Sequence, residues 1–481
     1  MGISLQTSVR KQATRTARRR TGTALAVVPL LFLAGCLGAS SDAPRDLEAP
    51  LAPASLPSYR LECPPGETLR RGDVCVRTIA SPVESYQELT LAIDPTDPSR
   101  MAISANAMGV RASSPADPAG WGPYGARGVV FVTEDGGATW RDAAFPAFPH
   151  GPHQQAEAGD LRLAFGADGT LHVIGMGFTY GHTPLVLPAY TGGILYSSTR
   201  DFRTWTAPVY AGGEADTDFP MMATGGASGV AVGWYEPRAG HWGVGFARSL
   251  DNGATWDRVH RECWVSQPLF VQEDVWMGCP IVTLVDGAWN GTGVHVLRWA
   301  ADAVEPEIVA TLPWHGIDRM DLYRHEGRFL AVVLTLDNRI LTTWSADGIA
   351  WSEFADPLAA VSLDDPEPRP HFHGAALDPH GVLHVVMAWS ECVRNNVVWT
   401  CPVHGKLHFA WDPEGERLLG EEVLAPRGGP VPRRSPPVLE PGLGWGDDYS
   451  GVAFTAEFGF LAWSLDRGID LARVAIEPAT G

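Results

Sequence analysis

The sequence predicts an all-β fold assembled from repeated units, and three observations lead to this prediction. An eight-residue signature recurs along the chain. Apolar runs rich in β-branched and aromatic residues precede its copies, as expected of strands. No helical periodicity is sustained over several turns, whereas glycine (53 residues) and proline (39 residues) are abundant, as a fold with many turns requires. All-β repeat folds often run long, so 481 residues can form a single main domain.

The signature is most complete at Ser249–Trp256 (SLDNGATW) and Thr133–Trp140 (TEDGGATW), and eroded copies lie at Ser198–Trp205, Ser345–Trp351 and Ser464–Leu471. We interpret it as a hairpin turn, because its aspartate can accept backbone N–H groups and its glycine can supply a positive φ. The terminal tryptophan can pack across the neighbouring sheet. We therefore expect a structural role for Asp135, Gly137, Trp140, Asp201, Trp205, Asp251, Gly253, Trp256, Asp347 and Trp351.

The signature resembles the Asp-box, or BNR repeat, of sialidases and related β-propellers, and the resemblance covers nearly everything after about residue 85. It implies a β-propeller with four-stranded antiparallel blades. In that family the box joins the third and fourth strands of a blade, on the rim away from the active site. Because many proteins other than sialidases carry the box, the resemblance implies a fold rather than an activity.

The spacing of the copies gives a blade count. Their final residues are separated by 65, 51, 95 and 120 positions, and each of the last two gaps is long enough for two units. Boxes lost from the additional units are expected near 299–302 and 411–415. The sequence therefore predicts seven blades, with six, the number in sialidases, as the alternative.

Each predicted unit opens with an acidic or polar cluster followed by an apolar strand. In a propeller these openings would surround the mouth of the central channel. Carboxylates there can exchange protons at a glycosidic bond, hold a cation such as calcium, or cap strand ends, and these alternatives stay open. The predicted lining is Glu88, Asp160, Asp218, Asp274, Asp318, Arg319, Arg369, His371, Asp448 and Tyr449.

The resemblance also implies a set of catalytic residues for a sialidase. It consists of three arginines that bind the sugar carboxylate, a tyrosine nucleophile with a glutamate partner, and an aspartate acid/base. The Arg-Ile-Pro motif that usually carries the first arginine is absent from this sequence. An acidic mouth also disfavours an anionic sugar. The candidates are Arg162, Arg319 and Arg369 as a substitute triad, Tyr449 as nucleophile, and the carboxylates Asp160 and Asp218.

The N-terminus predicts export. Residues 1–35 carry six basic and no acidic side chains and include a short apolar run, as signal peptides do. Leu33-Ala34-Gly35-Cys36 resembles a lipobox, so Cys36 is the expected lipid anchor; an ordinary secretory signal is the alternative. We expect a flexible Pro/Ala/Ser-rich tether at 36–57, a disulfide-clamped extension at 58–85 and the propeller at 86–481.

Six further cysteines form three sequence-local pairs, which favours disulfides in an exported chain. Zinc is the competing interpretation, but no C-x2-C spacing is present. The expected pairs are Cys63–Cys75, Cys263–Cys279 and Cys392–Cys401.

The formal charge is −19, and removal of the basic leader brings the mature chain near −25. This charge argues against nucleic acid or anionic lipid as partners. We expect a monomer on the outer face of the cell membrane or its periplasmic side, attached to the membrane only through the lipid. No cofactor is expected, apart from calcium as an alternative. The leading function is binding of a glycan or protein ligand at the mouth. A glycoside hydrolase, acting as a divergent exo-α-sialidase or on neutral glycans, and an envelope scaffold are the alternatives.

Overall fold

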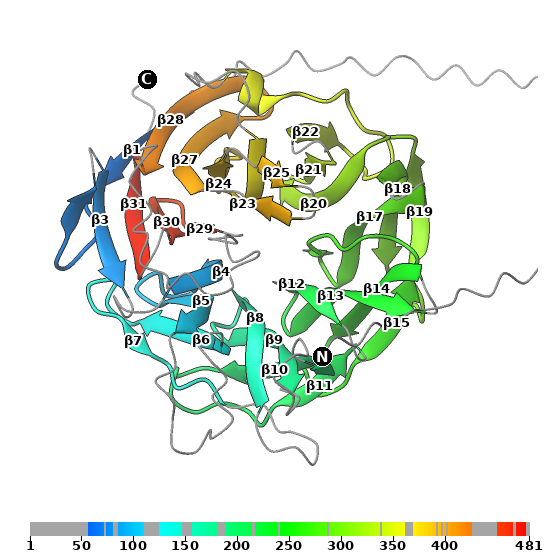
Figure 1. Ribbon diagram of the computed structural model, residues 1–481, viewed down its shortest axis with the longest axis horizontal. Coiled ribbons are helices and arrows are strands. Elements are labelled where there is room, and N and C mark those ends of the chain that lie inside the picture. The colour runs from blue at the N-terminus through cyan, green and yellow to red at the C-terminus, as the bar shows by residue number, and fades with distance from the viewer. Residues whose placement is uncertain are drawn as a thin grey trace, which may run out of the picture. The chain divides into compact units, whose positions relative to one another are not determined.

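A computed structural model shows seven antiparallel sheets arranged as blades around a central axis (Figure 1). The predicted seven-bladed propeller is confirmed, and the six-bladed alternative is wrong. Cys36, the leader and the tether up to residue 55 lie outside the described residues. The structure describes residues 56–71, 74–79, 85–109, 125–146, 156–179, 189–213, 217–238, 241–285, 288–336, 339–360, 369–390, 393–395, 398–400, 403–425, 450–464 and 468–477.

The first four blades each contain four strands in chain order. Blade 1 comprises β4 (Ser85–Ile93), β5 (Met101–Gly109), β6 (Gly125–Thr133) and β7 (Arg141–Asp142); blade 2 comprises β8 (Ala156–Phe165), β9 (Leu171–Thr179), β10 (Ala189–Thr199) and β11 (Val209–Gly212). Blade 3 comprises β12 (Asp218–Gly225), β13 (Gly229–Arg238), β14 (His241–Ser249) and β15 (Asp257–Arg261); blade 4 comprises β16 (Leu269–Val271), β17 (Asp274–Val285), β18 (Ala288–Trp299) and β19 (Glu307–Leu312).

The last three blades vary this plan. Blade 5 comprises β20 (Ile317–His325), β21 (Arg328–Thr335) and β22 (Ile340–Ser345), with bridges from β22 to Trp351 and Ala355 in place of a full fourth strand, followed by the 3-10 turn η1 (Pro357–Ala360). Blade 6 comprises β23 (Arg369–Leu377), β24 (Leu383–Ser390), β27 (Val403–Asp412) and β28 (Arg417–Ala425), and the hairpin β25 (Val393–Asn395) and β26 (Val398–Thr400) extends from it. Blade 7 contains β29 (Gly451–Phe454), β30 (Phe458–Trp463) and β31 (Ile469–Glu477).

The outer strand of blade 7 comes from the N-terminal segment. Both β1 (Ser58–Glu62) and β3 (Val74–Ile79) pair antiparallel with β31, one after the other along its length. The excursion between them includes β2 (Leu69–Arg71) and is closed by the Cys63–Cys75 disulfide. The segment expected as an extension therefore supplies the strand that closes the ring.

Strand register distinguishes the two ends of the propeller. Ile93 at the end of β4 pairs with Met101, and Met101 pairs with Thr133 at the end of β6. The first and third strands of a blade therefore end at the same side, which we call the box end because Asp-boxes follow third strands. First strands begin at the opposite side, which we call the mouth end.

Apolar cores lie between consecutive blades. Side chains of blade 1 such as Val130 and Val132 pack with Leu161 and Leu163 of blade 2, and Phe460 of blade 7 packs in one cluster with residues of blade 1. Inner strands are buried on both faces, which explains near-continuous apolar runs such as that of β21. Among the described residues, no helix is long and apolar enough to cross a membrane.

Candidate functional site

Five first strands are interrupted near the mouth end by a register shift typical of a β-bulge. The shifts lie in β4, β8, β12, β20 and β23. Bulges re-aim side chains and leave residues unpaired with the neighbouring strand. At these shifts the backbone of Glu88, Asp160 and Phe219 adopts a positive φ. The sequence pattern of acidic residues at strand starts thus corresponds to a repeated irregularity at one end of the ring.

Asn106 joins two of these acidic side chains. Its Nδ2 donates to Glu88 Oε2 at 3.0 Å and to Asp160 Oδ1 at 2.6 Å, and its Oδ1 accepts the backbone N–H of Asp160 at 2.8 Å. That N–H lies in the bulge, so the amide supplies a hydrogen bond that strand pairing does not. Asn106 is buried on the second strand of blade 1 and links this blade to blade 2. Sequence reasoning missed it, because no local pattern distinguishes an asparagine inside a strand.

Asp218 on blade 3 continues this chain of polar groups. It shares a hydrogen bond with Asp160, so one of the two carboxyl groups must carry a proton. Burial and the Asp160 carboxylate raise the pKa of Asp218 to about 7, while the Arg162 guanidinium opposes the increase. Asp218 therefore holds a proton to higher pH than an exposed aspartate does.

Arg162 is buried beside the carboxylates. Its Nη1 donates to the carbonyl oxygens of Glu88 at 3.1 Å and Leu161 at 3.4 Å. The guanidinium therefore secures the backbone of the blade 1 bulge and lowers the local electrostatic cost of the acidic cluster.

A second acidic group lies at the mouth end of blade 5. Burial raises the pKa of Asp318 to about 6, against the effect of neighbouring Arg319. Arg319 forms a two-point ion pair with Asp321, with Nε–Oδ1 at 2.8 Å and Nη2–Oδ2 at 2.6 Å. Asp321 also accepts the backbone N–H of Gln267. The Arg319 guanidinium is thus directed to a carboxylate on its own strand.

Three half-buried aromatic residues accompany Asp218. Phe219 follows Asp218 in the bulge, and Tyr235 on β13 is the strand-pairing partner of Asp218. The ring centroids of Phe219 and Tyr235 are 5.6 Å apart, and those of Tyr235 and Trp264 are 5.3 Å apart, both edge to face. An aromatic series therefore runs beside the carboxyl pair.

Asp274 does not belong to the mouth, contrary to prediction. It pairs with Val271 across the turn from the first to the second strand, at the box end, and its carboxylate binds Arg298. The acidic cluster that includes Asp274 therefore lies at the start of the second strand of blade 4, and not at the start of the first strand. The first strand is preceded by the segment 264–268, in which Ser266 accepts the backbone N–H of Met320 on blade 5.

The remaining candidates are only partly described. Arg369 and His371 lie on β23 at the mouth end, where their backbone is described but their side chains are not. Asp448 and Tyr449 lie outside the described residues, so the expected arginine triad and nucleophile stay predictions. The Cys263–Cys279 disulfide is confirmed, like Cys63–Cys75, whereas Cys392 and Cys401 lie outside the described residues.

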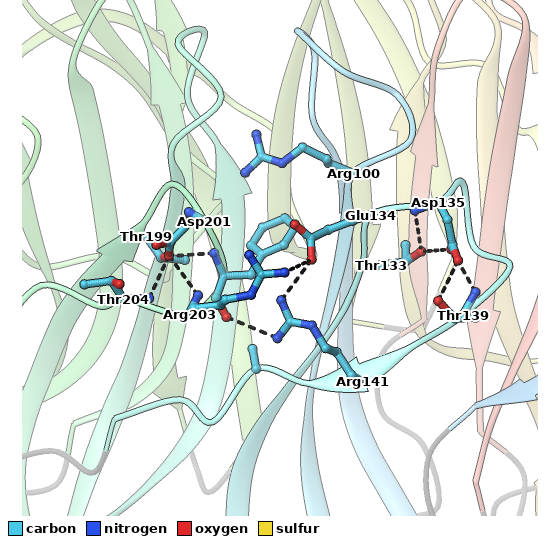
Figure 2. Close-up of polar contacts among 12 residues, drawn as sticks. Arg100, Thr133, Glu134, Asp135, Thr139, Arg141, Thr199, Asp201, Arg203 and Thr204 are labelled. Atoms are coloured by element: carbon cyan, nitrogen blue, oxygen red, sulfur yellow. Dashed lines mark hydrogen bonds and ion pairs between the residues drawn. The ribbon is translucent and has the colours of Figure 1, made fainter.

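The predicted hairpin turns have the geometry expected of a structural aspartate. Asp135 accepts the Thr139 N–H at 2.8 Å and the Thr133 hydroxyl at 2.7 Å (Figure 2). Trp140 Nε1 donates to the Gly137 carbonyl at 3.1 Å. The other complete copy repeats these contacts. Asp251 accepts the Thr255 N–H and the Ser249 hydroxyl, and Trp256 Nε1 donates to the Gly253 carbonyl. Asp201 and Asp347 likewise accept two backbone N–H groups each.

The box turns of blades 1 and 2 are also linked by charge. Figure 2 shows Glu134 accepting from both Arg141 and Arg203, each at 3.1 Å. Backbone N–H groups of Thr204 and Arg203 lower the pKa of Asp201, which stays ionised. These residues lie at the end opposite to the mouth cluster, so they have no part in it.

Three other predicted turns behave differently. Ser464–Leu471 joins the second and third strands of blade 7, so this eroded copy is not at the box position. The turn near 411–415 retains a box-like aspartate, because Asp412 accepts the N–H groups of Glu414 and Gly415. The turn after Trp299 instead receives Arg248 from blade 3, which donates to the carbonyls of Trp299, Ala300, Ala301 and Ala303.

Within the described residues, no group of three or more His, Cys, Asp or Glu side chains is arranged to hold a metal ion. The mouth cluster contains three carboxyl groups, but Asn106 donates to two of them and Asp218 shares a hydrogen bond with Asp160.

Comparison with known proteins gives similarities of fold only. No family model matches the sequence, and no curated protein matches it. A Dyadobacter fermentans protein of unknown function is 12% identical over 84% of this chain and 99% of its own, with a TM-score of 0.45. Trypanosoma rangeli sialidase is 12% identical over 87% of this chain and 60% of its own, with a TM-score of 0.39. Penicillium chrysogenum α-L-arabinanase is 10% identical over 53% of this chain and 92% of its own, with a TM-score of 0.34.

Proposed function

We propose that this protein is an exported, lipid-anchored propeller that binds an uncharged, hydroxyl-rich ligand such as a neutral glycan at its mouth end, without chemical turnover. The observation that carries the proposal is the chain from Glu88 through Asn106 and Asp160 to Asp218, with the aromatic series of Phe219, Tyr235 and Trp264 beside it.

The chemistry of this surface suits sugar hydroxyls. Carboxyl oxygens of Glu88 and Asp160 can accept hydrogen bonds from sugar hydroxyls in addition to those that Asn106 donates. Half-buried aromatic faces beside polar groups are typical of ligand sites and can contact the apolar face of a sugar ring. Carboxylates repel anionic sugars, which favours a neutral ligand.

The arrangement argues against glycoside hydrolysis by the Asp160–Asp218 pair. The two catalytic carboxyl groups of retaining glycosidases lie about 5–5.5 Å apart, and those of inverting enzymes about 6.5–9.5 Å. Two carboxyl groups that hydrogen-bond to each other are too close to stand on either side of a glycosidic bond. The arginines Arg162 and Arg319 are also directed to protein acceptors.

A hydrolase is the second candidate, and one observation favours it. A carboxyl group whose pKa is raised to about 7 by burial, as that of Asp218 is, is suited to general acid catalysis. The second catalytic group would then come from another residue than Asp160.

The test uses the purified chain on an array of neutral and sialylated glycans, with hydrolysis of neutral aryl glycosides and a fluorogenic sialoside measured in parallel. Binding of neutral glycans that is weakened by Asp218→Asn and Asp160→Asn, with no turnover, supports the proposal. Asp257→Asn is the matched control, because this exposed carboxylate lies on an outer strand of blade 3. Turnover abolished by Asp218→Asn would overturn the binding-only function.

Export and anchoring are separate parts of the proposal. Two disulfides are typical of proteins from oxidising compartments. Replacement of Cys36 by serine should move the protein from the membrane fraction to the soluble fraction. A protein that stays membrane-bound after this change would contradict lipid attachment at Cys36.

A further inference from the structure

Three exposed apolar side chains lie at the tips of successive blades. Leu250 is 39% exposed, Val304 is 85% exposed and Ile349 is 53% exposed. Each lies in the connection between the third and fourth strands, in blades 3, 4 and 5 respectively. Since third strands end at the box end, all three side chains protrude from the same end of the propeller.

The chain enters the propeller at this end as well. Ser58, the first residue of β1, pairs with Glu477 at the end of β31. Because β31 is the third strand of blade 7, its last residue lies at the box end. A tether that precedes Ser58 therefore joins the propeller on the side that carries the three apolar tips, and the mouth lies on the opposite side.

From these two observations we propose that the box end is a membrane-facing surface, on which Leu250, Val304 and Ile349 enter the interfacial layer of the bilayer while the mouth points away from it. The inference extends the proposed anchoring at Cys36 and goes beyond it, because it assigns a direct contact between the folded domain and lipid.

The reach of the tether favours this orientation. Nineteen residues, 37–55, separate Cys36 from Leu56, where the described chain begins. A nine-residue first strand such as β4 is about 30 Å long, and a segment that joined at the mouth end would have to span this height in addition. A tether that joins at the box end brings that end to the membrane without crossing the height of the blades.

Lipid fits the tips better than a folded protein partner does. The side chains are isolated on separate turns, whereas protein interfaces present a continuous apolar core. Isolated apolar tips can enter the boundary between head groups and acyl chains.

The experiment places an environment-sensitive fluorophore on single introduced cysteines. The chain from residue 37 carries six histidines at its N-terminus and is bound to phosphatidylcholine vesicles through a nickel-chelating lipid, so the test does not depend on lipidation of Cys36. A fluorophore on Val304→Cys reports whether the apolar tips at the box end enter the bilayer. Ile308→Cys, which is 55% exposed on the edge strand β19, and His315→Cys, which is exposed in the mouth-end connection between blades 4 and 5, are the controls. The unsubstituted chain measures background labelling.

We expect the Val304 label to shift to shorter emission wavelength and to be quenched by brominated lipid, while the labels at Ile308 and His315 remain unchanged. Leu250→Asp combined with Ile349→Asp should reduce the quenching at Val304, and Ile308→Asp should not. Equal emission at all three positions, or quenching at His315 alone, would overturn the proposal. Failure of lipid attachment would appear only in the fractionation of Cys36→Ser.

Discussion

Replacing Arg248 by methionine removes the clamp that blade 3 applies to the outer turn of blade 4. The Arg248 side chain is 2% exposed and donates to four carbonyl oxygens of this turn, including those of Trp299 at 3.3 Å and Ala301 at 3.1 Å. Its guanidinium also lies 4.4 Å from the centroid of the Trp299 ring. Methionine fills a similar volume without a charge or a donor.

The expected loss follows from these contacts. A hydrogen bond to a charged group contributes about 1.5–3 kcal/mol, and a partly desolvated cation–π contact about 1–2 kcal/mol. Ala300, Ala301 and Ala303 are only half-buried, so water can replace part of the bonding to their carbonyls, and the terms are not additive. Removal of the buried cation also relieves its desolvation cost. We therefore expect Arg248→Met to lower the free energy of unfolding by about 4 kcal/mol.

The assay is urea unfolding followed by near-UV circular dichroism, with both disulfides intact. Arg203→Met is the control, because this exposed arginine binds only Glu134 and should cost less than about 1 kcal/mol. The midpoint should fall while the slope m stays constant, since the buried surface is unchanged. Equal midpoints for the two variants would show that the clamp is not what stabilises this turn.

Three further predictions concern the mouth and the ring closure. Asn106→Asp replaces two donors by an acceptor between Glu88 and Asp160 and should lower stability by about 3 kcal/mol in urea unfolding, with the exposed Asn290→Asp as the control. Because the folded-state pKa of Asp218 is raised to about 7, the wild type loses stability as pH rises from about 5 to 8, and relative to Asp218→Asn this loss should reach about 2 kcal/mol; parallel pH profiles for both proteins would contradict it. Replacing Cys63 and Cys75 by serine should cost about 3 kcal/mol and expose the intervening excursion to limited proteolysis, and unaltered cleavage would refute a latching role.

The fold was predictable from sequence because its repeated turn uses side chains with a specific task. Asp251, Gly253 and Trp256 each make a contact that few other residues can make, so the pattern survives in the sequence. The blade count survived the loss of a box for a different reason. In blade 4 the turn after the third strand is held by Arg248 of blade 3 and not by a box aspartate of its own. The spacing of the strands therefore persists although the signature is lost.

The mouth was predictable only in part. First and second strands are both buried and apolar, so the sequence does not distinguish them, and Asp274 was assigned to the wrong end of blade 4. Asn106 and Asp160 are 54 positions apart and meet only because adjacent blades pack together. Register shifts decide which side chains face the mouth, and they depend on strand pairing that no single strand reveals.

The closure of the ring explains why residues 58–79 cannot be separated from the propeller. The outer strand of blade 7 is assembled from β1 and β3, and the Cys63–Cys75 disulfide joins the point where β1 ends to the start of β3. The Tyr59 hydroxyl on β1 donates at 2.7 Å to Asp378, which belongs to blade 6, so this strand ties two blades as well as two ends of the chain. The disulfide closes the excursion between β1 and β3, and this gives a physical reason for placing a crosslink in the closing strand.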